Sequence, residues 1–319
     1  MPPQPLVTHI FTADPSAHAF EGRVFIYPSH DLDADAQEND LGDQYAMTDY
    51  RILSQSHPEG PATDHGEALH LRDVPWASRQ LWAPDAAFRD GRYYLYFPAR
   101  DKQGAFRIGV AIADRPEGPF QPEPEPIAGS FSIDPCAFQD DDGEFYLVFG
   151  GLWGGQLQCW TNGSFKPGTQ EPPDDALALC PKIARLTPDM KQFVAPPQDA
   201  VIVDDAGQRL RSGDRSRRYF EGPWLHKYRG TYYLSYSTGD THYLVYATSD
   251  QPTGPFTFRG RLLNPVLGWT THHSIVEFDG RWWLYYHDAS LSGGISYKRS
   301  VKVQELFYGA DGSIRLMNP

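Results

Sequence analysis

Gly91-Arg-Tyr-Tyr-Leu-Tyr96 is a stretch in which a glycine opens a run of aromatic residues, and four other stretches of the chain repeat its pattern. They are Gly22-Arg-Val-Phe-Ile-Tyr27, Gly143-Glu-Phe-Tyr-Leu-Val148, Gly230-Thr-Tyr-Tyr-Leu-Ser235 and Gly280-Arg-Trp-Trp-Leu-Tyr285. An aspartate directly before three of the glycines favours a hairpin, because Asp-Gly suits turns with positive φ. The residues that follow are typical of a strand buried on both faces. Each stretch therefore predicts a turn followed by a buried strand.

The five glycines are spread along the whole chain, at intervals of 69, 52, 87 and 50 residues. A hairpin-and-strand unit repeated in this way indicates a propeller or a solenoid. The unequal intervals predict insertions at Asp31–Asp43 and Trp153–Arg217, and helical periodicity is nearly absent. We therefore expect an all-β fold, a five-bladed β-propeller that forms a single catalytic domain over residues 1–319. The alternative is a β-sandwich, which has no reason to repeat one motif five times.

Four ionisable residues stand at nearly the same distance before these glycines. Asp14 and His272 precede their glycines by eight residues, and Asp134 and Glu221 by nine. In a propeller the first strand of each blade lines the central channel, so these side chains would face a shared cavity.

The second repeat departs from this pattern. Alignment of its proline with the others puts Ala83 at the shared position and leaves Asp85 two residues out of register. We therefore expect Asp85 to be a structural residue, in a turn or as an acceptor for backbone groups.

Three carboxylates that converge on one axis would repel one another unless the site uses them. Carboxylates held this close shift each other's pKa values, so one stays protonated while another is ionised near neutral pH. Glycoside hydrolysis needs that division, with an acid for the leaving oxygen and a base for water.

The chain carries an ordered set of short motifs: Thr-Ala-Asp14-Pro, Leu-Trp-Ala-Pro-Asp85, Ser-Ile-Asp134-Pro, Tyr-Phe-Glu221-Gly-Pro and His272-His273-Ser. With these motifs it resembles glycoside hydrolase family 43 over essentially its whole length. That family comprises five-bladed propellers with β-xylosidase, α-L-arabinofuranosidase or arabinanase activity.

The resemblance implies a role for each acid. Asp14 would be the general base that activates water, and Glu221 the general acid that protonates the leaving oxygen. Asp134 would orient Glu221 and adjust its pKa. The family inverts anomeric configuration, which implies a separation of about 6.5–9.5 Å between base and acid, whereas about 5 Å would contradict the assignment.

The resemblance also implies a calcium ion at the propeller centre, with His272 as a ligand or a water-mediated anchor. Because Ca²⁺ prefers oxygen ligands, a single histidine implies that waters complete the shell. The alternative is a histidine that is simply hydrogen-bonded inside the channel. His273 would point to the opposite face of its strand and pack there.

Two residues are candidate substrate contacts. Arg299, in Tyr-Lys-Arg299-Ser, matches a family arginine that resembles a contact to a sugar hydroxyl or a carboxylate, and a structural ion pair is the alternative. Trp82 would stack on a sugar ring or pack in the core. Trp153 and Trp269 lie between repeats, where they could rim the pocket.

The composition excludes some partners and suggests a compartment. The net charge of −13 disfavours a nucleic-acid partner, which needs a basic surface. The three cysteines, without metal spacing, favour a reducing compartment. The first residues do not resemble a signal peptide, and apolar runs are too short to span a membrane. We expect a cytoplasmic protein with no membrane partner.

A cytoplasmic location favours short imported oligosaccharides and exo-action at their non-reducing ends. We expect β-1,4-xylo-oligosaccharides first and terminal α-L-arabinofuranosyl groups second, with an arabinanase as a further alternative. Two further alternatives are a different class of glycosidase and a protein without catalytic activity. A retaining fructosidase would carry Asn-Asp-Pro, Arg-Asp-Pro and Glu-Cys motifs in place of those quoted. A non-catalytic sugar-binding propeller would have no need of a matched acid and base.

Overall fold

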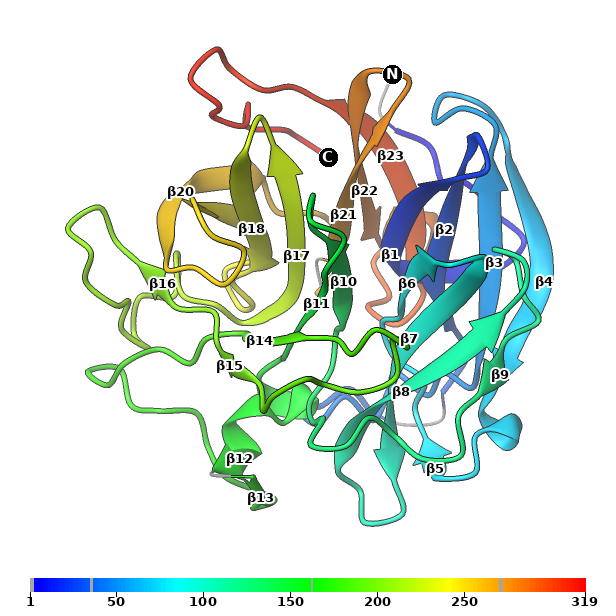
Figure 1. Ribbon diagram of the computed structural model, residues 1–319, viewed down its shortest axis with the longest axis horizontal. Helices are drawn as coiled ribbons and strands as arrows, with labels where there is room; N and C mark the ends of the chain where they lie inside the picture. The colour runs from blue at the N-terminus through cyan, green and yellow to red at the C-terminus, as the bar shows by residue number, and fades with distance from the viewer. Residues whose placement is uncertain (1–2, 35–36, 162, 270–271) are drawn as a thin grey trace.

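Five antiparallel sheets stand around a central axis in the computed structural model, which describes residues 3–34, 37–161, 163–269 and 272–319 (Figure 1). Their innermost strands contact one another in a closed ring, in the order β1, β6, β10, β17 and β21. The expected five-bladed β-propeller is therefore confirmed, and the β-sandwich alternative is wrong. Two residues of the first predicted insertion, 35 and 36, lie outside the described residues.

Each blade is one sheet, with its main strands in chain order from the axis outward. Blade 1 contains β1 (Phe11–Phe20), β2 (Arg23–Asp31), β3 (Asp49–Gln55) and β4 (Ala62–His70). Blade 2 contains β6 (Asp85–Arg89), β7 (Arg92–Asp101), β8 (Phe106–Ala113) and β9 (Gln121–Pro122), and β5 (Ala77–Arg79) also pairs with β7. Blade 3 contains β10 (Cys136–Gln139), β11 (Phe145–Phe149), β14 (Lys182–Arg185) and β15 (Gln198–Asp199).

Blade 4 contains β17 (Glu221–Tyr228), β18 (Thr231–Ser237), β19 (Leu244–Ser249) and β20 (Phe256–Leu263), and β16 (Ile202–Val203) pairs with β20 in parallel. Blade 5 contains β21 (His273–Phe278), β22 (Arg281–Asp288) and β23 (Ser300–Leu306). The second insertion adds the hairpin of β12 (Trp160–Thr161) and β13 (Ser164–Phe165). Four short 3₁₀ helices complete the elements: η1 (Leu71–Asp73), η2 (Trp153–Gly155), η3 (Leu157–Cys159) and η4 (Ser290–Ser292).

The repeated glycines close the hairpin between the first two strands of each blade. At four of them the preceding residue and the glycine both have positive φ, for example Asp90 (51°) and Gly91 (78°). This is the geometry of a type I′ turn, whose twist matches that of the flanking strands. In blade 3 Gly143 alone has positive φ, and its amide donates to the carbonyl of Asp140. That hairpin carries a longer loop.

The aromatic strands are buried on both faces, as their composition predicts. Successive residues of a strand point to opposite faces of its sheet. On β7, Tyr93 therefore packs into the cluster between blades 1 and 2, with Phe25 and Tyr27. Tyr94 packs into the next cluster, with Leu147 of blade 3. These clusters between blades form the core.

Strand pairing fixes which inner-strand residues are equivalent. Counted from the hairpin turn, Asp14 and His272 hold the same position, and Ala83 holds it in blade 2. Glu221 lies one residue earlier, at the position that Ala13 holds in blade 1, and a β-bulge follows it. Asp134 holds the shared position as well, because it lies six residues before Asp140, whose amide donates to the carbonyl of Glu144 across the hairpin. The four ionisable residues therefore lie at nearly the same height, as expected, with Glu221 one residue away from the other three.

The two ends of the chain meet in blade 5. The amide of Leu6 donates to the carbonyl of Val301 in β23 (2.8 Å), and that of Thr12 donates to the carbonyl of Arg299 (2.9 Å). Val7 is buried in the cluster that contains Val301 and joins blade 1 to blade 5. These contacts close the ring.

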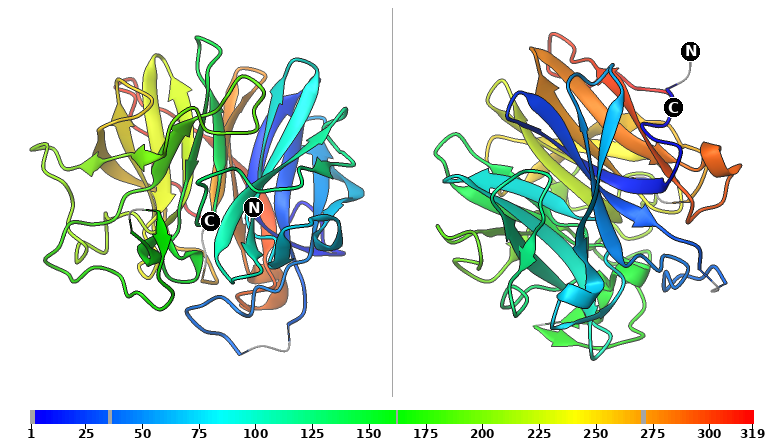
Figure 2. Two further views of the ribbon diagram at one scale, coloured as in Figure 1. Left: turned by 60° about the horizontal axis from the view of Figure 1, so that its bottom comes forward. Right: turned by 90° about the vertical axis from the view of Figure 1, so that its right-hand side faces the viewer.

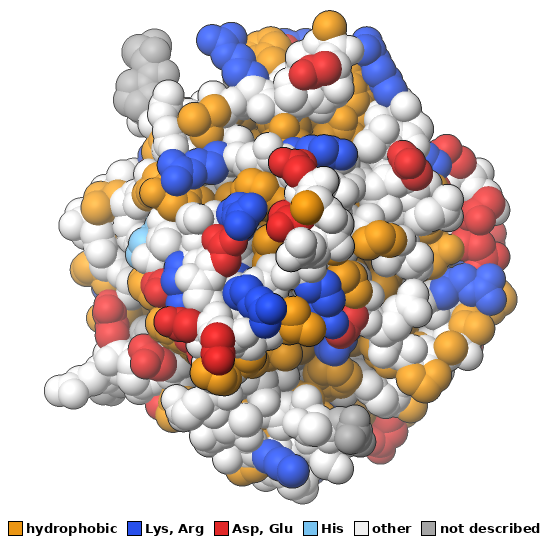
Figure 3. All heavy atoms as spheres, turned by 90° about the vertical axis from the view of Figure 1, so that its left-hand side faces the viewer, with side chains coloured by type: hydrophobic (Ala, Val, Ile, Leu, Met, Phe, Trp, Pro, Cys, Tyr) orange, Lys and Arg blue, Asp and Glu red, His pale blue; other side chains and the backbone are white. Residues whose placement is uncertain are grey.

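The molecule has two further features, a segment beyond the strand ends and a charged outer face. Residues 37–48, which come after β2, lie beyond the strand ends on one side of the molecule (Figure 2). On the face that carries β16 and β20, acidic and basic side chains lie interspersed (Figure 3). Among the described residues, no helix is long and apolar enough to cross a bilayer.

Candidate active site

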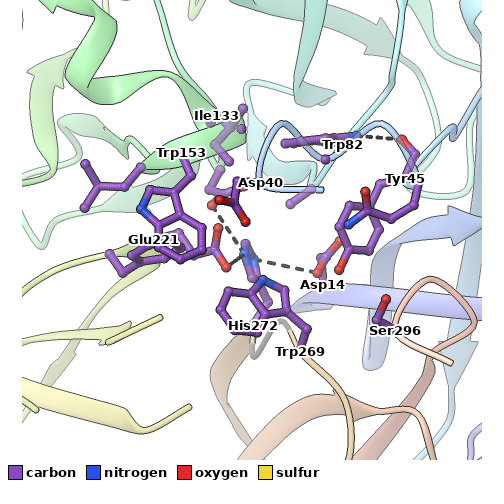
Figure 4. Close-up of a pocket in the computed structure, with 18 of the residues that line it drawn as sticks. Asp14, Asp40, Tyr45, Trp82, Ile133, Trp153, Glu221, Trp269, His272 and Ser296 are labelled. Carbon is purple, nitrogen blue, oxygen red and sulfur yellow. Dashed lines mark hydrogen bonds and ion pairs between the residues drawn. The ribbon is translucent and has the colours of Figure 1, made fainter. Parts of the chain in front are cut away.

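A cavity of about 220 Å³ opens on the propeller axis, and all five blades contribute to its lining. The shared inner-strand positions supply Asp14, Ala83, Asp134 and His272, and blade 4 adds Glu221. The structure therefore brings together the three predicted acids and the predicted histidine. In Figure 4 the His272 ring lies between Asp14 and Glu221. The separation of about 6.5–9.5 Å between Asp14 and Glu221 that is expected of an inverting enzyme stays a prediction.

Asp14 is held in an uncommon backbone conformation, with φ of 48°. Its amide donates to Nδ1 of His287 (2.9 Å), and its carboxylate accepts from Ser29 Oγ (2.7 Å) and Arg299 Nη1 (2.9 Å). Burial raises the pKa of Asp14, but Arg299, His272 and other neighbours together lower it by more. The net pKa therefore lies well below its usual value. Asp14 is therefore ionised across the neutral range.

Arg299 is the group that holds Asp14. Its Nε and Nη2 donate to the two carboxylate oxygens of Asp31 (2.8 and 2.7 Å), which leaves Nη1 for Asp14. Burial lowers the pKa of Arg299, but Asp14 and Asp31 raise it by more, so the guanidinium stays protonated. Of the two expected roles the ion pair is present, and the side chain also lines the cavity.

Glu221 has the opposite electrostatic balance. Its burial raises the pKa, His272 lowers it, and the charges of Asp134 and Asp14 raise it again, to about 8. Glu221 is thus protonated at neutral pH while Asp14 is ionised. This is the division that the sequence led us to expect, and the repulsion from Asp134 contributes to it.

Asp134 and His272 form an ion pair between these two groups. Asp134 has φ of 59°, and its Oδ2 accepts from the Gly222 amide (3.0 Å) and lies 3.3 Å from Nε2 of His272. Burial raises the pKa of Asp134, and His272 opposes that rise. For His272, burial lowers the pKa, but Asp134, Asp14 and Glu221 raise it to about 10. The imidazolium therefore balances the carboxylates.

Asp134, Glu221 and His272 also form a possible metal-binding group. One donor atom from each lies within 4.8 Å of the others. Ca²⁺ takes six to eight ligands, mostly oxygens. Two carboxylates and one imidazole nitrogen fit such an ion only if waters complete its shell and the ion displaces the protons that His272 and Glu221 carry without it.

Aromatic residues form much of the cavity wall. Trp82 lines it and also packs on Phe106, with ring centroids 4.7 Å apart, so its packing role is present, and stacking on a sugar ring stays a prediction. Trp153 and Trp269 stack at 5.7 Å, with 17° between their planes, and both line the cavity. The sequence left these two residues open because they lie in segments between blades.

Asp85 and His273 are structural, as expected. Asp85 is fully buried, and its carboxylate accepts from the Ala137 amide (2.6 Å) and contacts His18 Nε2 (2.5 Å), which ties three blades together. His273 points away from the pocket and bonds Ser235 Oγ at 2.6 Å.

Sequence reasoning missed several groups that shape the site. The second strands of blades 1 and 5 carry Asp31, Ser29 and His287, whereas the spacing to the repeated glycines indicates only residues of the first strands. In the sequence Asp31 is only the first residue of a predicted insertion, although Arg299, with which it pairs, is predicted as a candidate substrate contact. A search for a carboxylate partner to that arginine could have found it.

Comparisons with known proteins agree with this geometry. Residues 7–314 match the family model of glycosyl hydrolases family 43. The chain is 59% identical to a xylosidase/arabinosidase 43A of Humicola insolens over 99% of each chain, and 49% identical to a beta-xylosidase of Xylanibacter ruminicola over 96% of each.

Solved structures give the same result. A GH43 beta-xylosidase/alpha-arabinofuranosidase from a compost microbial metagenome, crystallised with xylotriose in a calcium-free form, is 60% identical with a TM-score of 0.98, over 99% of this chain and 97% of that one. A GH43_1 enzyme of Xanthomonas citri complexed with xylotriose is 55% identical with a TM-score of 0.95, over 100% and 94%. The chain therefore belongs to glycosyl hydrolases family 43 and is a glycosidase.

Proposed function

We propose that this glycosidase is an exo-acting, inverting β-1,4-xylosidase that releases xylose from the non-reducing ends of short xylo-oligosaccharides. The observation that carries the proposal is the opposite protonation of two carboxyl groups in one cavity. The pKa of Asp14 is lowered and that of Glu221 is raised to about 8. Relatives named beta-xylosidase and a relative complexed with xylotriose support the substrate.

In the proposed reaction Glu221 gives its proton to the glycosidic oxygen as the bond from that oxygen to the anomeric carbon breaks. Asp14 takes a proton from a water molecule, which attacks the anomeric carbon from the opposite face. The configuration is therefore inverted. Asp134 keeps Glu221 protonated by its charge, and Arg299 holds the Asp14 carboxylate in place.

A second activity on terminal α-L-arabinofuranosyl groups is part of the proposal. Two relatives are named xylosidase/arabinosidase, and one solved relative is described as a beta-xylosidase/alpha-arabinofuranosidase. β-Xylopyranose and α-L-arabinofuranose can present similar hydroxyl arrangements to one pocket. We expect the same acid and base to serve both.

Calcium is also proposed, with His272 and Asp134 holding the ion and water completing its shell. A bound ion would supply fixed positive charge on the axis. The donor group described above and the calcium-free form of one relative support this. The thermal midpoint should rise with added Ca²⁺ and fall with a chelator, and an unchanged midpoint would contradict calcium binding.

We propose a cytoplasmic location, which the three buried free cysteines support. Fractionation of the native cells would test this. A small oligosaccharide remains the proposed partner.

The catalytic proposal is tested with xylotriose and a panel of nitrophenyl glycosides. The first xylose released from the β-linked substrate should be the α-anomer, which NMR detects before mutarotation. Asp14→Asn and Glu221→Gln should each lower kcat on xylotriose by about 10³-fold. A general acid or base typically contributes about 10²–10⁴-fold to the rate. Release of the β-anomer, or activity that survives both substitutions, would refute the assignment.

A further inference from the structure

Two loops from different blades meet at the wall of the cavity. The 37–48 loop follows β2, and the 150–156 loop follows β11. Gly42 and Tyr45 of the first loop and Trp153 and Gly154 of the second line the cavity. A Cβ atom on Gly154 would lie 2.8 Å from the carbonyl oxygen of Leu41. The two backbones are therefore in direct contact, at a spacing that only glycine permits.

Arg100, near the end of β7, connects these loops from behind. Its Nη2 donates to the carbonyl of Leu41 (3.0 Å) and lies 3.5 Å from that of Gly154. Its Nε donates to Gln80 Oε1 (2.6 Å), and Gln80 Nε2 in turn donates to the carbonyl of Gly42 (2.9 Å). One guanidinium thus holds both walls, although Arg100 itself does not line the cavity.

The environment of Arg100 makes these contacts costly to lose. The side chain is buried, with its guanidinium 4.6 Å from the Phe106 ring centroid. In the described parts of the chain it forms no ion pair with a carboxylate, so carbonyl and amide oxygens alone solvate the charge. A hydrogen bond to a charged group contributes more than one between neutral groups, and an unsatisfied buried charge costs more still. Both walls are therefore tied to this side chain.

The 150–156 loop and the Leu41 part of the 37–48 loop that it contacts lie on the side of the cavity where the leaving group belongs, whereas the Tyr45 ring centroid lies 4.9 Å from the Arg299 guanidinium. Figure 4 shows Trp153 on the side of Glu221, and Asp14 across the His272 ring from them. A Cβ atom on Gly151 of the 150–156 loop would lie 3.3 Å from Cβ of Glu221. Because a general acid donates its proton to the leaving oxygen, the departing sugar lies next to Glu221 and these walls.

We infer that Arg100 is a positioning residue that holds the two loops at the spacing required to bind the leaving-group sugar. The inference rests on the proposed xylosidase function and adds a determinant of its affinity for oligosaccharides. Arg100 acts through the loops and touches neither the substrate nor the acid and base.

The test compares two substrates of the same glycone. Xylotriose has a sugar leaving group, whereas the leaving group of β-D-xylosyl fluoride is a single atom that cannot reach the walls. For Arg100→Met we expect KM for xylotriose to rise about tenfold or more, which corresponds to about 1.4 kcal/mol, with kcat changed by less than about threefold. For the fluoride, kcat/KM should stay within about twofold of the wild-type value.

Arg107→Met is the matched control. Arg107 lies on β8, donates to Asp101 (3.2 Å) and to the carbonyl of Ser130 (3.1 Å), and its guanidinium lies 4.5 Å from the Trp160 ring centroid. It contacts neither wall through these bonds, so both substrates should behave as in the wild type. Its thermal midpoint also reports what the loss of a comparable arginine costs in stability.

Gly154→Ala tests the same spacing from the other side, because the added methyl group must push the loops apart. It should reproduce the rise in KM for xylotriose, and Arg100→Lys should be intermediate. Equal loss on both substrates, or an unchanged KM for xylotriose in Arg100→Met and Gly154→Ala, would overturn the inference. If Arg100→Met does not fold, Gly154→Ala and Arg100→Lys decide. Failure of the wild-type enzyme to hydrolyse either substrate would instead refute the proposed function.

Discussion

Single residues in the site carry strain and charge that the rest of the molecule must offset. Asp14 and Asp134 both have positive φ, which few residues other than glycine adopt. Such conformations persist where the surroundings determine them, and they are concentrated at functional sites. Here the fixing groups are His287 for the Asp14 backbone and the Gly222 amide for the Asp134 carboxylate. The two acids are thus held before any substrate arrives.

The pKa of Glu221 predicts where activity falls on the alkaline side. With its pKa raised to about 8, Glu221 loses the proton that it must donate as the pH rises through that value. We expect kcat/KM for xylotriose to fall with a midpoint near pH 8. Asp134→Asn removes the charge that raises this pKa, so its residual activity should decline at lower pH. An alkaline limb that does not move in this variant would contradict the stated role of Asp134.

The same group predicts a conflict between activity and stability. Below pH 4.5 Glu221 is protonated in the folded and the unfolded chain. Between pH 4.5 and 8 the unfolded chain releases this proton while the folded chain keeps it. The raised pKa of Glu221 in the folded chain therefore lowers the free energy of unfolding as the pH rises. Glu221→Gln should therefore raise the thermal midpoint at pH 8.5 by about 3 °C or more, since 1 kcal/mol shifts it by about 2–4 °C. The gain should vanish near pH 4.5, and a gain independent of pH would exclude this explanation.

At the scale of elements, the type I′ turns are the units that the glycine repeat encodes. Gly280 has φ of 72°, and a Cβ atom there would meet nothing within 4 Å. Any loss from Gly280→Ala is therefore backbone strain alone. We expect about 1–2 kcal/mol from urea unfolding, and less for Gly280→Asn because asparagine tolerates this conformation better. Equal losses would point to a cause other than φ.

Elements also show how far the sequence could predict structure. Asp-Gly pairs identify their turns directly, and the aromatic runs identify the strands that follow. The one-residue offset of Glu221 could not be read in the same way. Asp134 also precedes its glycine by nine residues, but its hairpin carries a longer loop, so the distance to the glycine alone does not distinguish the two cases. The separation of Glu221 from its glycine matches that of Asp134 but conceals the offset.

At the scale of the whole molecule, the ring is closed by residues distant in sequence. Val7 is buried in the cluster between blades 1 and 5. Val7→Ala should lower the free energy of unfolding by about 1–2 kcal/mol, as large-to-small core substitutions do. Val194 is 47% exposed, so Val194→Ala is the control and should change stability by less than about 0.5 kcal/mol. If the two variants unfold alike, the closure contributes no more than the surface.

The assembled molecule also explains what sequence reasoning could not reach. The ring brings first-strand positions onto one axis, so Asp14, Asp134 and His272 could be predicted from periodicity. Asp31 and Arg100 act through second strands and loops, and their partners are set by how blades pack. Their contacts, such as Arg100 with Leu41, join segments that no local pattern relates.

Ala83 holds in blade 2 the position that Asp14, Asp134 and His272 hold in theirs, and it lines the same cavity. Each blade thus offers one side chain to the centre from a framework that its own hairpin maintains. Asp14, Asp134 and His272 are joined by ion pairs across the blades, so a substitution at any of them disturbs the charge of the others. Ala83 carries no charge, and a new side chain there would change the shape of the centre while these pairs stay in place.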